Sequence, residues 1–93
     1  MDYDSRITGQ IIGMLRTRRG ISQEVLSGLA NLARSHLAMI ENGSKNASVS
    51  TLWRIASALG IRLSELIRMI EDETGKTAPE QQEKFSKLPT NYK

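Results

Sequence analysis

Residues 22–43 read SQEVLSGLANLARSHLAMIENG, and the spacing of their apolar side chains indicates two short helices joined by a tight turn. Ser22 is a favoured N-cap residue and predicts the start of the first helix. Asn31 suits the turn, because asparagine tolerates a positive φ better than most residues with a side chain. The second helix is expected over about residues 33–41 and to stop at Gly43. We take this pair of helices as the centre of the fold.

The second helix of this pair has two chemically different faces. Four apolar residues around the turn and along one side are expected to be buried: Leu26, Leu32, Leu37 and Ile40. Successive residues of a helix are about 100° apart, so five other residues are expected on the opposite face: Arg34, Ser35, Ala38, Met39 and Asn42. Solvated helix faces usually carry Lys and Glu, whereas this one has an arginine, no acid and otherwise short or neutral groups. Arginine pairs with guanine, serine bonds a base edge or a phosphate, and apolar groups contact a thymine methyl, so this face suits the DNA major groove.

Apolar residues recur at helical spacing on both sides of this pair, which predicts three further helices. A helix before the pair is marked by Ile7, Ile11, Met14 and Leu15, with Gly20 as its stop. A helix after it is expected between the cap Ser48 and the stop Gly60, with these residues inward: Leu52, Ile55, Ala56 and Leu59. A last helix is expected to be capped by Ser64 and to carry an apolar stripe: Leu63, Leu66, Ile67 and Ile70. The sequence therefore predicts an all-α domain with five helices.

The chain of 93 residues is long enough for one compact domain, which we expect over residues 5–73. Beyond it, glycine, prolines and charges leave little to bury. Residues 74–93 are therefore interpreted as a polar tail, which is flexible or forms one short extra helix. That helix would span Pro79 to Leu88, with Phe85 as an apolar contact.

Composition excludes several classes of protein. The sequence has no cysteine and one histidine, His36, so disulfides and metal sites are not expected. The polar N-terminus lacks the features of a secretory signal, and no apolar run approaches the ~20 residues of a membrane helix, so a cytoplasmic location is expected.

Residues 1–70 contain 9 Lys and Arg against 5 Asp and Glu, and this excess of positive charge is compatible with binding to nucleic acid. No catalytic set or glycine-rich phosphate loop points to an enzyme, and no cofactor is expected.

Residues 7–70 resemble the Xre/Cro/phage-repressor helix-turn-helix family, with the helix-turn-helix itself at about residues 22–42. The matching residues span most of the chain: Ser22-Gln23-Glu24, Leu26, Ala30, Leu32, Arg34-Ser35, Leu37, Ile40-Glu41, Asn42-Gly43, Ser48, Thr51-Leu52, Ile55-Ala56, Ala58-Leu59-Gly60 and Ser64-Glu65-Leu66. The resemblance implies a lambda-repressor-like fold and a transcriptional regulator, most simply a repressor, that binds double-stranded DNA. Small members of this kind include phage repressors, controller proteins of restriction-modification systems and antitoxins, and the sequence leaves these three open.

The resemblance also implies which residues contact DNA: Gln23, Arg34, Ser35, Met39, Asn42 and Lys45. Gln23 matches a glutamine that bonds a phosphate and braces the recognition helix, which is the third helix. Arg34, Ser35 and Met39 match positions that face base edges, while the remaining two match positions that contact the DNA backbone. Structural alternatives stay open for these residues: a solvated arginine at Arg34, a helix cap at Gln23, and a core or dimer contact at Met39.

An ion pair between Arg16 and Glu41, joining the first and third helices, is also implied by the resemblance. The sequence departs from the family pattern at other positions. Asn31 replaces the usual turn glycine, and Ala33 stands where a Ser or Thr commonly caps the recognition helix. Met39 is apolar where a polar base reader is frequent. These departures leave the predicted fold intact but make the target sequence unpredictable.

A monomer of this size reads only a few base pairs, so a homodimer bound to a near-palindromic operator is expected. Two-fold pairing would place two recognition helices about one DNA turn, ~34 Å, apart. An apolar set is expected to form the dimer interface: Trp53, Leu63, Leu66, Ile67 and Ile70. The alternative is a protein-interaction module or antitoxin-type partner binder that keeps the fold. Acids or large apolar groups on the recognition face would favour that alternative.

Overall fold

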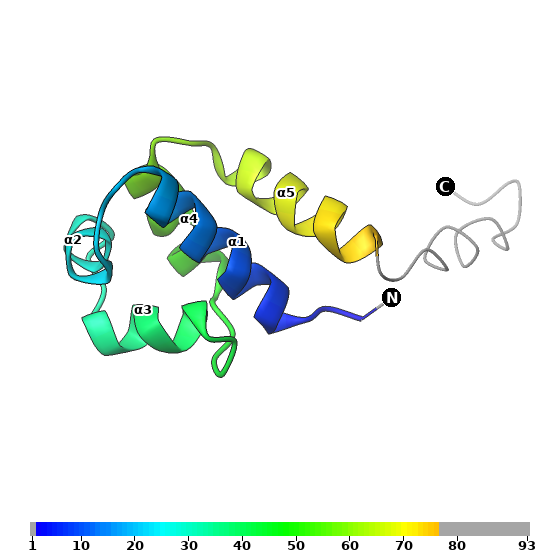
Figure 1. Cartoon of the computed structure of the whole chain (residues 1–93), viewed down its shortest axis with the longest axis horizontal. Coiled ribbons are helices and arrows are strands. Elements are labelled where there is room, and N and C mark those ends of the chain that lie inside the picture. Colours follow the sequence, from blue (N-terminus) through cyan, green and yellow to red (C-terminus); the bar gives the residue numbers. More distant parts are fainter. Residues whose placement is uncertain (1, 77–93) are drawn as a thin grey trace, which may run out of the picture.

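Residues 2–76 are described by the computed structural model, and they form five α-helices without a strand. In chain order the helices are α1 (Ser5–Arg18), α2 (Gln23–Leu29), α3 (Arg34–Glu41), α4 (Val49–Leu59) and α5 (Leu63–Gly75). α1 packs against α3 and α5, α2 packs against α3 and α4, and α4 packs against α5 (Figure 1). The predicted all-α class with five helices is confirmed, and no helix within residues 2–76 is long and apolar enough to span a bilayer. The further helix predicted between Pro79 and Leu88 lies outside the described residues.

Serine caps begin two of the helices at the predicted places. The hydroxyl oxygen of Ser22 accepts a hydrogen bond from the backbone N–H of Val25 at 3.1 Å, and that of Ser48 accepts one from Thr51 at 3.1 Å. Each bond satisfies a first-turn N–H that has no partner inside its helix. Asn31 has a φ of 57°, so the turn between α2 and α3 adopts the left-handed conformation predicted for it.

The start of α5 differs from the prediction. Ser64 is not the cap, because α5 begins at Leu63 and its N-cap is Arg62. The Glu65 carboxylate accepts a hydrogen bond from the backbone N–H of Arg62 at 2.9 Å. An acid in the first turn therefore holds the start of the helix two residues earlier than a cap at Ser64 would. The helix continues to Gly75, and the domain boundary expected after residue 73 therefore falls inside it.

An apolar core lies between the helices and draws on all five of them. Its buried members are Ile11, Ile12, Leu26, Ala30, Leu37, Ile40, Leu52, Ile55, Ala56, Leu59, Leu66 and Ile70. Leu66 and Ile70, which were expected at the dimer surface, are 0% and 6% exposed and therefore belong to the core of the protomer itself. The cause is the placement of α5, which packs on both α1 and α4 and so buries the middle of its apolar stripe. Leu63 and Ile67 remain half-buried at the edge of the core.

α1 and α3 approach each other closely at Gly9. A Cβ at this position would overlap the backbone carbonyl oxygens of Ile40 and Glu41. Gly9 is buried, so only glycine fits between the two helices there. This contact sets how deeply the C-terminal end of α3 lies against α1.

We expect Gly9→Ala to lower the free energy of unfolding by about 1–3 kcal/mol, because the two helices must separate to admit the methyl group. Gly28→Ala is the matched control. A Cβ at the exposed Gly28 of α2 meets no atom within 4 Å, and alanine favours a helix over glycine by up to about 1 kcal/mol. Urea denaturation of both variants measures the difference. Equal effects of the two substitutions would contradict close packing at Gly9.

Candidate nucleic-acid interface

One side of α3 is anchored in the core, and the other side faces solvent. Leu37 and Ile40 are 0% and 1% exposed, so they fix the inner side of the helix. Three residues predicted to face bases, Arg34, Ser35 and Met39, are all exposed on its outer side. An α-helix with its side chains is about 10–12 Å across, which matches the width of the major groove of about 12 Å. The structure therefore brings the three predicted base readers together on a face of suitable size.

The outer face of α3 carries polar groups that have no hydrogen-bond partner within the described residues. Within residues 2–76, the side chains of Arg34 and Ser35 make no hydrogen bond or ion pair. Ala33, the N-cap, gives the first turn no side-chain hydrogen bond, as expected from its departure from the family pattern. His36 is half-buried, and nowhere in the described chain do three or more His, Cys, Asp or Glu side chains gather to hold a metal ion. A guanidinium, a hydroxyl and uncapped backbone amides are thus available to an anionic or polar partner.

The loop after α3 is held in shape by its own hydrogen bonds. Asn42 Oδ1 accepts a bond from the backbone N–H of Ser44 at 2.8 Å, and the Ser44 hydroxyl donates to the carbonyl of Met39 at 3.3 Å. Gly43 lies between them with a φ of 82°. Lys45 follows, exposed and without a side-chain partner in the described part of the chain. Asn42 therefore shapes the loop, and Lys45 is the group that the loop presents to solvent.

The carboxylate of Glu41, at the end of α3, ties this helix to two others. Arg16 of α1 donates to both carboxylate oxygens, at 2.8 Å from Nε and 3.1 Å from Nη2, and this bonding raises the pKa of the guanidinium. Gln23 of α2 donates from Nε2 to Oε1 of Glu41 at 3.1 Å. The ion pair expected between Arg16 and Glu41 is thus present, and the half-buried Gln23 joins it. Gln23 braces α3 through this carboxylate.

Arg54 of α4 stabilises the turn between α2 and α3, a role that the sequence analysis missed. Its Nη1 donates to the backbone carbonyl of Asn31 at 2.9 Å. The bond supports the residue that carries the positive φ of the turn. The two residues are 23 positions apart, and no sequence spacing links them. The available signal was an arginine on an exposed position of a helix whose other members are apolar or small.

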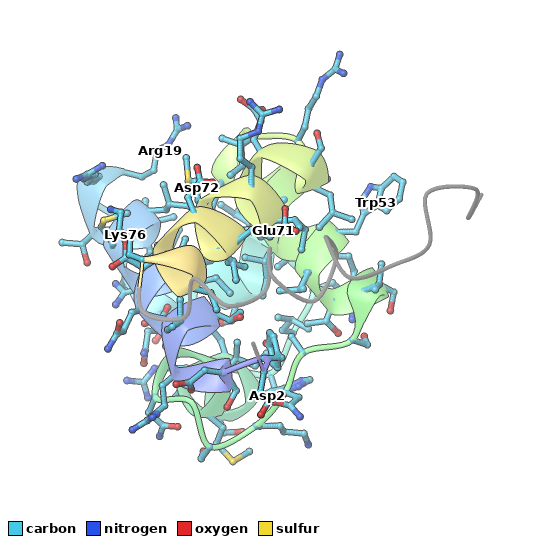
Figure 2. All side chains as sticks on the ribbon, turned by 90° about the vertical axis from the view of Figure 1, so that its right-hand side faces the viewer. Asp2, Arg19, Trp53, Glu71, Asp72 and Lys76 are labelled. Atoms are coloured by element: carbon cyan, nitrogen blue, oxygen red, sulfur yellow. The ribbon has the colours of Figure 1, made fainter. Side chains whose placement is uncertain are left out.

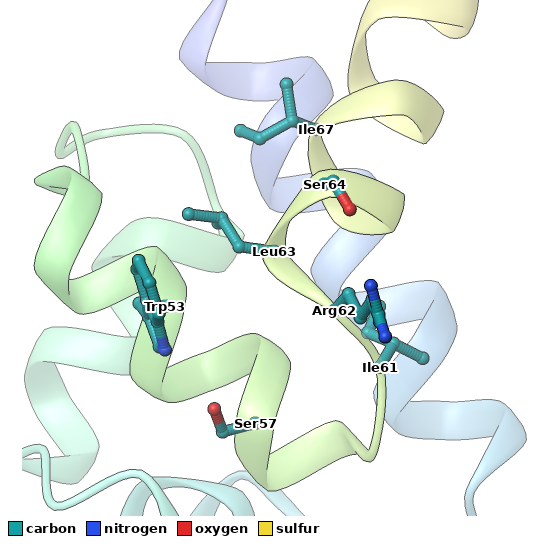
Figure 3. A pocket seen from close by; sticks show the side chains of 7 residues that line it. All are labelled: Trp53, Ser57, Ile61, Arg62, Leu63, Ser64 and Ile67. Carbon is teal, nitrogen blue, oxygen red and sulfur yellow. The ribbon is translucent and has the colours of Figure 1, made fainter.

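A second exposed feature is a groove between α4 and α5. Trp53 of α4 is 61% exposed and projects away from the ribbon (Figure 2). An open groove of about 710 Å³ lies beside it, lined by Trp53, Ser57, Ile61, Arg62, Leu63, Ser64 and Ile67. In Figure 3, the side chains of Leu63 and Ile67 on α5 and of Trp53 on α4 border the same space. Of the residues predicted at the dimer interface, these three therefore meet at one surface.

Known proteins share this arrangement of helices. A helix-turn-helix family model, HTH_3, matches residues 12–66. The immunity repressor protein of Bacillus phage phi105 is 46% identical over 59 residues, which are 63% of this chain and 41% of that protein, so the chain spans less than half of its length. The restriction-modification controller protein C.AhdI from Aeromonas hydrophila is 40% identical, and its crystal structure matches with a TM-score of 0.66 over 68% of this chain and 96% of that one. A variant of the controller protein C.Esp1396I, bound to its highest affinity operator site, is 25% identical, with a TM-score of 0.71 over 78% of this chain and 96% of that one.

We expect Arg16→Met to lower the free energy of unfolding by about 1–3 kcal/mol, because the Glu41 side chain, 9% exposed, loses its ion-pair partner. The double variant Arg16→Met/Glu41→Leu should lose less than the sum of the two single variants, since no charge is then left unpaired. Lys76→Ala is the control: it breaks an exposed pair with Glu73 and should change stability by less than about 0.5 kcal/mol. Urea unfolding of the set measures these values. Additive single effects would show that the two residues are not coupled.

Proposed function

Since the chain belongs to the HTH_3 helix-turn-helix family, we propose that it is a sequence-specific transcriptional regulator that binds a near-palindromic operator as a homodimer. The family consists of DNA-binding transcription regulators and not of enzymes. The chain is accordingly a DNA-binding regulator. The proposal concerns its contacts with DNA, its assembly and its mode of action.

The single observation that carries the proposal is the outer face of α3. This face presents Arg34 and Ser35 without partners in the described residues, and the one acid of α3, Glu41, is bonded to neighbouring helices instead. In the major groove, Arg34 pairs bidentately with O6 and N7 of guanine, and Ser35 bonds a base edge or a phosphate. Met39 contacts a thymine methyl. Contacts with base edges and with the thymine methyl distinguish bases, so the face reads sequence through them.

Contacts with the DNA backbone flank this face. Lys45 supplies a positive charge from the loop after α3. Asn42 uses its side-chain oxygen within the loop and keeps its amide N–H groups for a phosphate. Gln23 uses one amide N–H for Glu41 and keeps the other for a phosphate next to α2. Contacts of this kind fix the orientation of the protein on DNA without reading sequence.

The groove between α4 and α5 supports the homodimer. Tryptophan is among the residues most enriched at the energetic centres of interfaces, and Trp53 is exposed beside the apolar Leu63 and Ile67. A second copy that packs here by two-fold symmetry presents two α3 helices about one DNA turn, ~34 Å, apart. The same symmetry makes the operator a near-palindrome. The interface proposed here omits Leu66 and Ile70, which belong to the core.

The similarities favour a controller-type or repressor-type regulator. The chain covers 96% of C.AhdI, a controller protein, and it is also similar to an immunity repressor protein of a Bacillus phage over 41% of that longer protein. A dimer on its operator covers the DNA that it occupies. Repression by occlusion is therefore the simplest mode of action that we propose.

A binding selection from a random duplex pool at moderate salt tests the proposal. We expect enrichment of a near-palindrome with half-sites about one helical turn apart. If no motif is enriched and the residual binding disappears as salt is raised, the fold serves as a protein-interaction module and the proposal is wrong.

On the selected operator, Arg34→Ala should cost about 1–3 kcal/mol of binding free energy and relax the preference at one base position in each half-site. Arg68→Ala is the matched control, because this exposed arginine belongs to α5, on the other side of the domain from α3 (Figure 1). Fluorescence anisotropy with a labelled duplex measures affinity, and a repeated selection measures base preference. Unchanged affinity of the Arg34 variant would remove this residue from the base readers.

Trp53→Glu should raise the dissociation constant of the dimer about thirtyfold or more, since removing an interface tryptophan commonly costs about 2 kcal/mol. The monomer should keep its stability, because the side chain is 61% exposed. Met14→Glu, at an exposed apolar residue of α1 outside the groove, is the control. Sedimentation equilibrium measures both variants. Dimerisation that survives Trp53→Glu but not Met14→Glu would place the interface elsewhere.

A further inference from the structure

The first turn of α1 lies against the loop that follows α3, at the edge of the proposed DNA-binding face (Figure 1). The Ser5 hydroxyl donates to the backbone carbonyl of Gly43 at 2.7 Å. A Cβ at Gly43, whose φ is 82°, would lie 2.7 Å from Cγ and 2.8 Å from Cα of Arg6. The aliphatic part of the Arg6 side chain therefore rests directly on this glycine.

Arg6 and Lys45 consequently lie on neighbouring parts of the surface. Lys45 follows Gly43 by two residues, an extended span of at most about 7 Å, and Arg6 touches Gly43 itself. The Arg6 side chain is 75% exposed, and Lys45 is exposed as well. Phosphates of one DNA strand recur every ~3.4 Å along the helix axis, so two long basic side chains that start from neighbouring backbone can engage phosphates of the same strand segment.

In this structure the Arg6 guanidinium is held by the carboxylate of Asp4. Nε lies 3.2 Å from Oδ1 and Nη2 lies 3.0 Å from Oδ2, the fork geometry in which arginine also binds phosphate. The hydrogen bonds from Arg6 lower the pKa of the Asp4 carboxyl, which is therefore ionised at neutral pH. Both partners are accessible to water, with 75% and 33% of their side chains exposed. Exposed pairs of this kind contribute little to stability, so exchange of the carboxylate for another anion is easy.

We propose that Arg6 is a further phosphate contact, and that Asp4 competes with DNA for it. The inference rests on the proposed DNA-binding function and extends its contact surface from α2, α3 and the following loop to the first turn of α1. When the protein binds DNA, the Arg6 guanidinium releases the Asp4 carboxylate and binds a backbone phosphate in the same bidentate geometry. A phosphate contact carries no sequence information. Arg6 therefore raises the affinity for any duplex, and Asp4 lowers it for any duplex.

The salt dependence of DNA binding tests this inference, measured on the selected operator and on an unrelated duplex. Arg6→Ala should reduce the slope of log K against log salt by about 0.9 on both duplexes. Between about 50 and 200 mM salt, this variant should then lose about threefold less affinity than the unmodified chain. Arg6→Lys keeps the positive charge and should retain the slope. Arg68→Ala on α5 is the matched control and should leave the slope unchanged.

Asp4→Asn isolates the competing charge. The Asp4 side chain also caps α1, because Oδ1 accepts a bond from the backbone N–H of Arg6 at 2.9 Å, and asparagine is an equally good N-cap. The substitution therefore removes the charge and keeps the cap. We expect a higher affinity for both duplexes, by about the same factor, with an unchanged melting temperature.

The outcomes separate this inference from the proposed function. An unchanged slope in Arg6→Ala overturns the inference and leaves the proposed function standing, provided that Arg34→Ala still weakens the operator complex. A lower affinity of Asp4→Asn also overturns it, because Asp4 would then assist binding. If the unmodified chain selects no operator, the proposed function and the inference fail together.

Discussion

The carboxylate of Glu41 is the point on which the helix-turn-helix depends, because it receives hydrogen bonds from two other helices. An isolated helix of 8 residues is too short to be stable in water, so α3 relies on its surroundings for its existence as well as for its position. Leu37 and Ile40 hold its inner side in the core, and Arg16 and Gln23 fix its C-terminal end. These bonds also neutralise the one acid of α3 inside the domain. The outer face is left with positive charge only, so the same bonds that position the helix determine its electrostatic character.

The sequence predicted the starts of α2 and α4 and the turn before α3 closely, because these features rest on single residues or on contacts between residues a few positions apart. Ser22 and Ser48 bond amides in the first turn of their own helices, and the positive φ of Asn31 reflects a tolerance of that residue type. The burial of Leu37 and Ile40 follows from helical periodicity alone. The exposure of the candidate DNA contacts follows from the same periodicity. What each of them binds depends on a partner outside the chain, and their roles therefore stay predictions.

Contacts between distant segments were not predictable in this way. Periodicity identified the apolar stripe of α5, but the division of that stripe between core and surface depends on how α5 lies against α1 and α4. Leu66 and Ile70 fell on the core side for this reason. The bond from Arg54 to the carbonyl of Asn31 and the contact of Arg6 with Gly43 likewise arise only when the helices are assembled. No spacing rule along the chain encodes such contacts.

Trp53 is the sole tryptophan of the chain, and its indole lies in solvent and not in the core. Indole emission moves to shorter wavelength when water is removed from around the ring. Unfolding of the monomer changes the hydration of this ring little, because the ring is already largely hydrated in the folded state. Tryptophan emission from this chain is therefore a poor probe of folding. It is instead a spectroscopic probe of whatever covers the groove between α4 and α5.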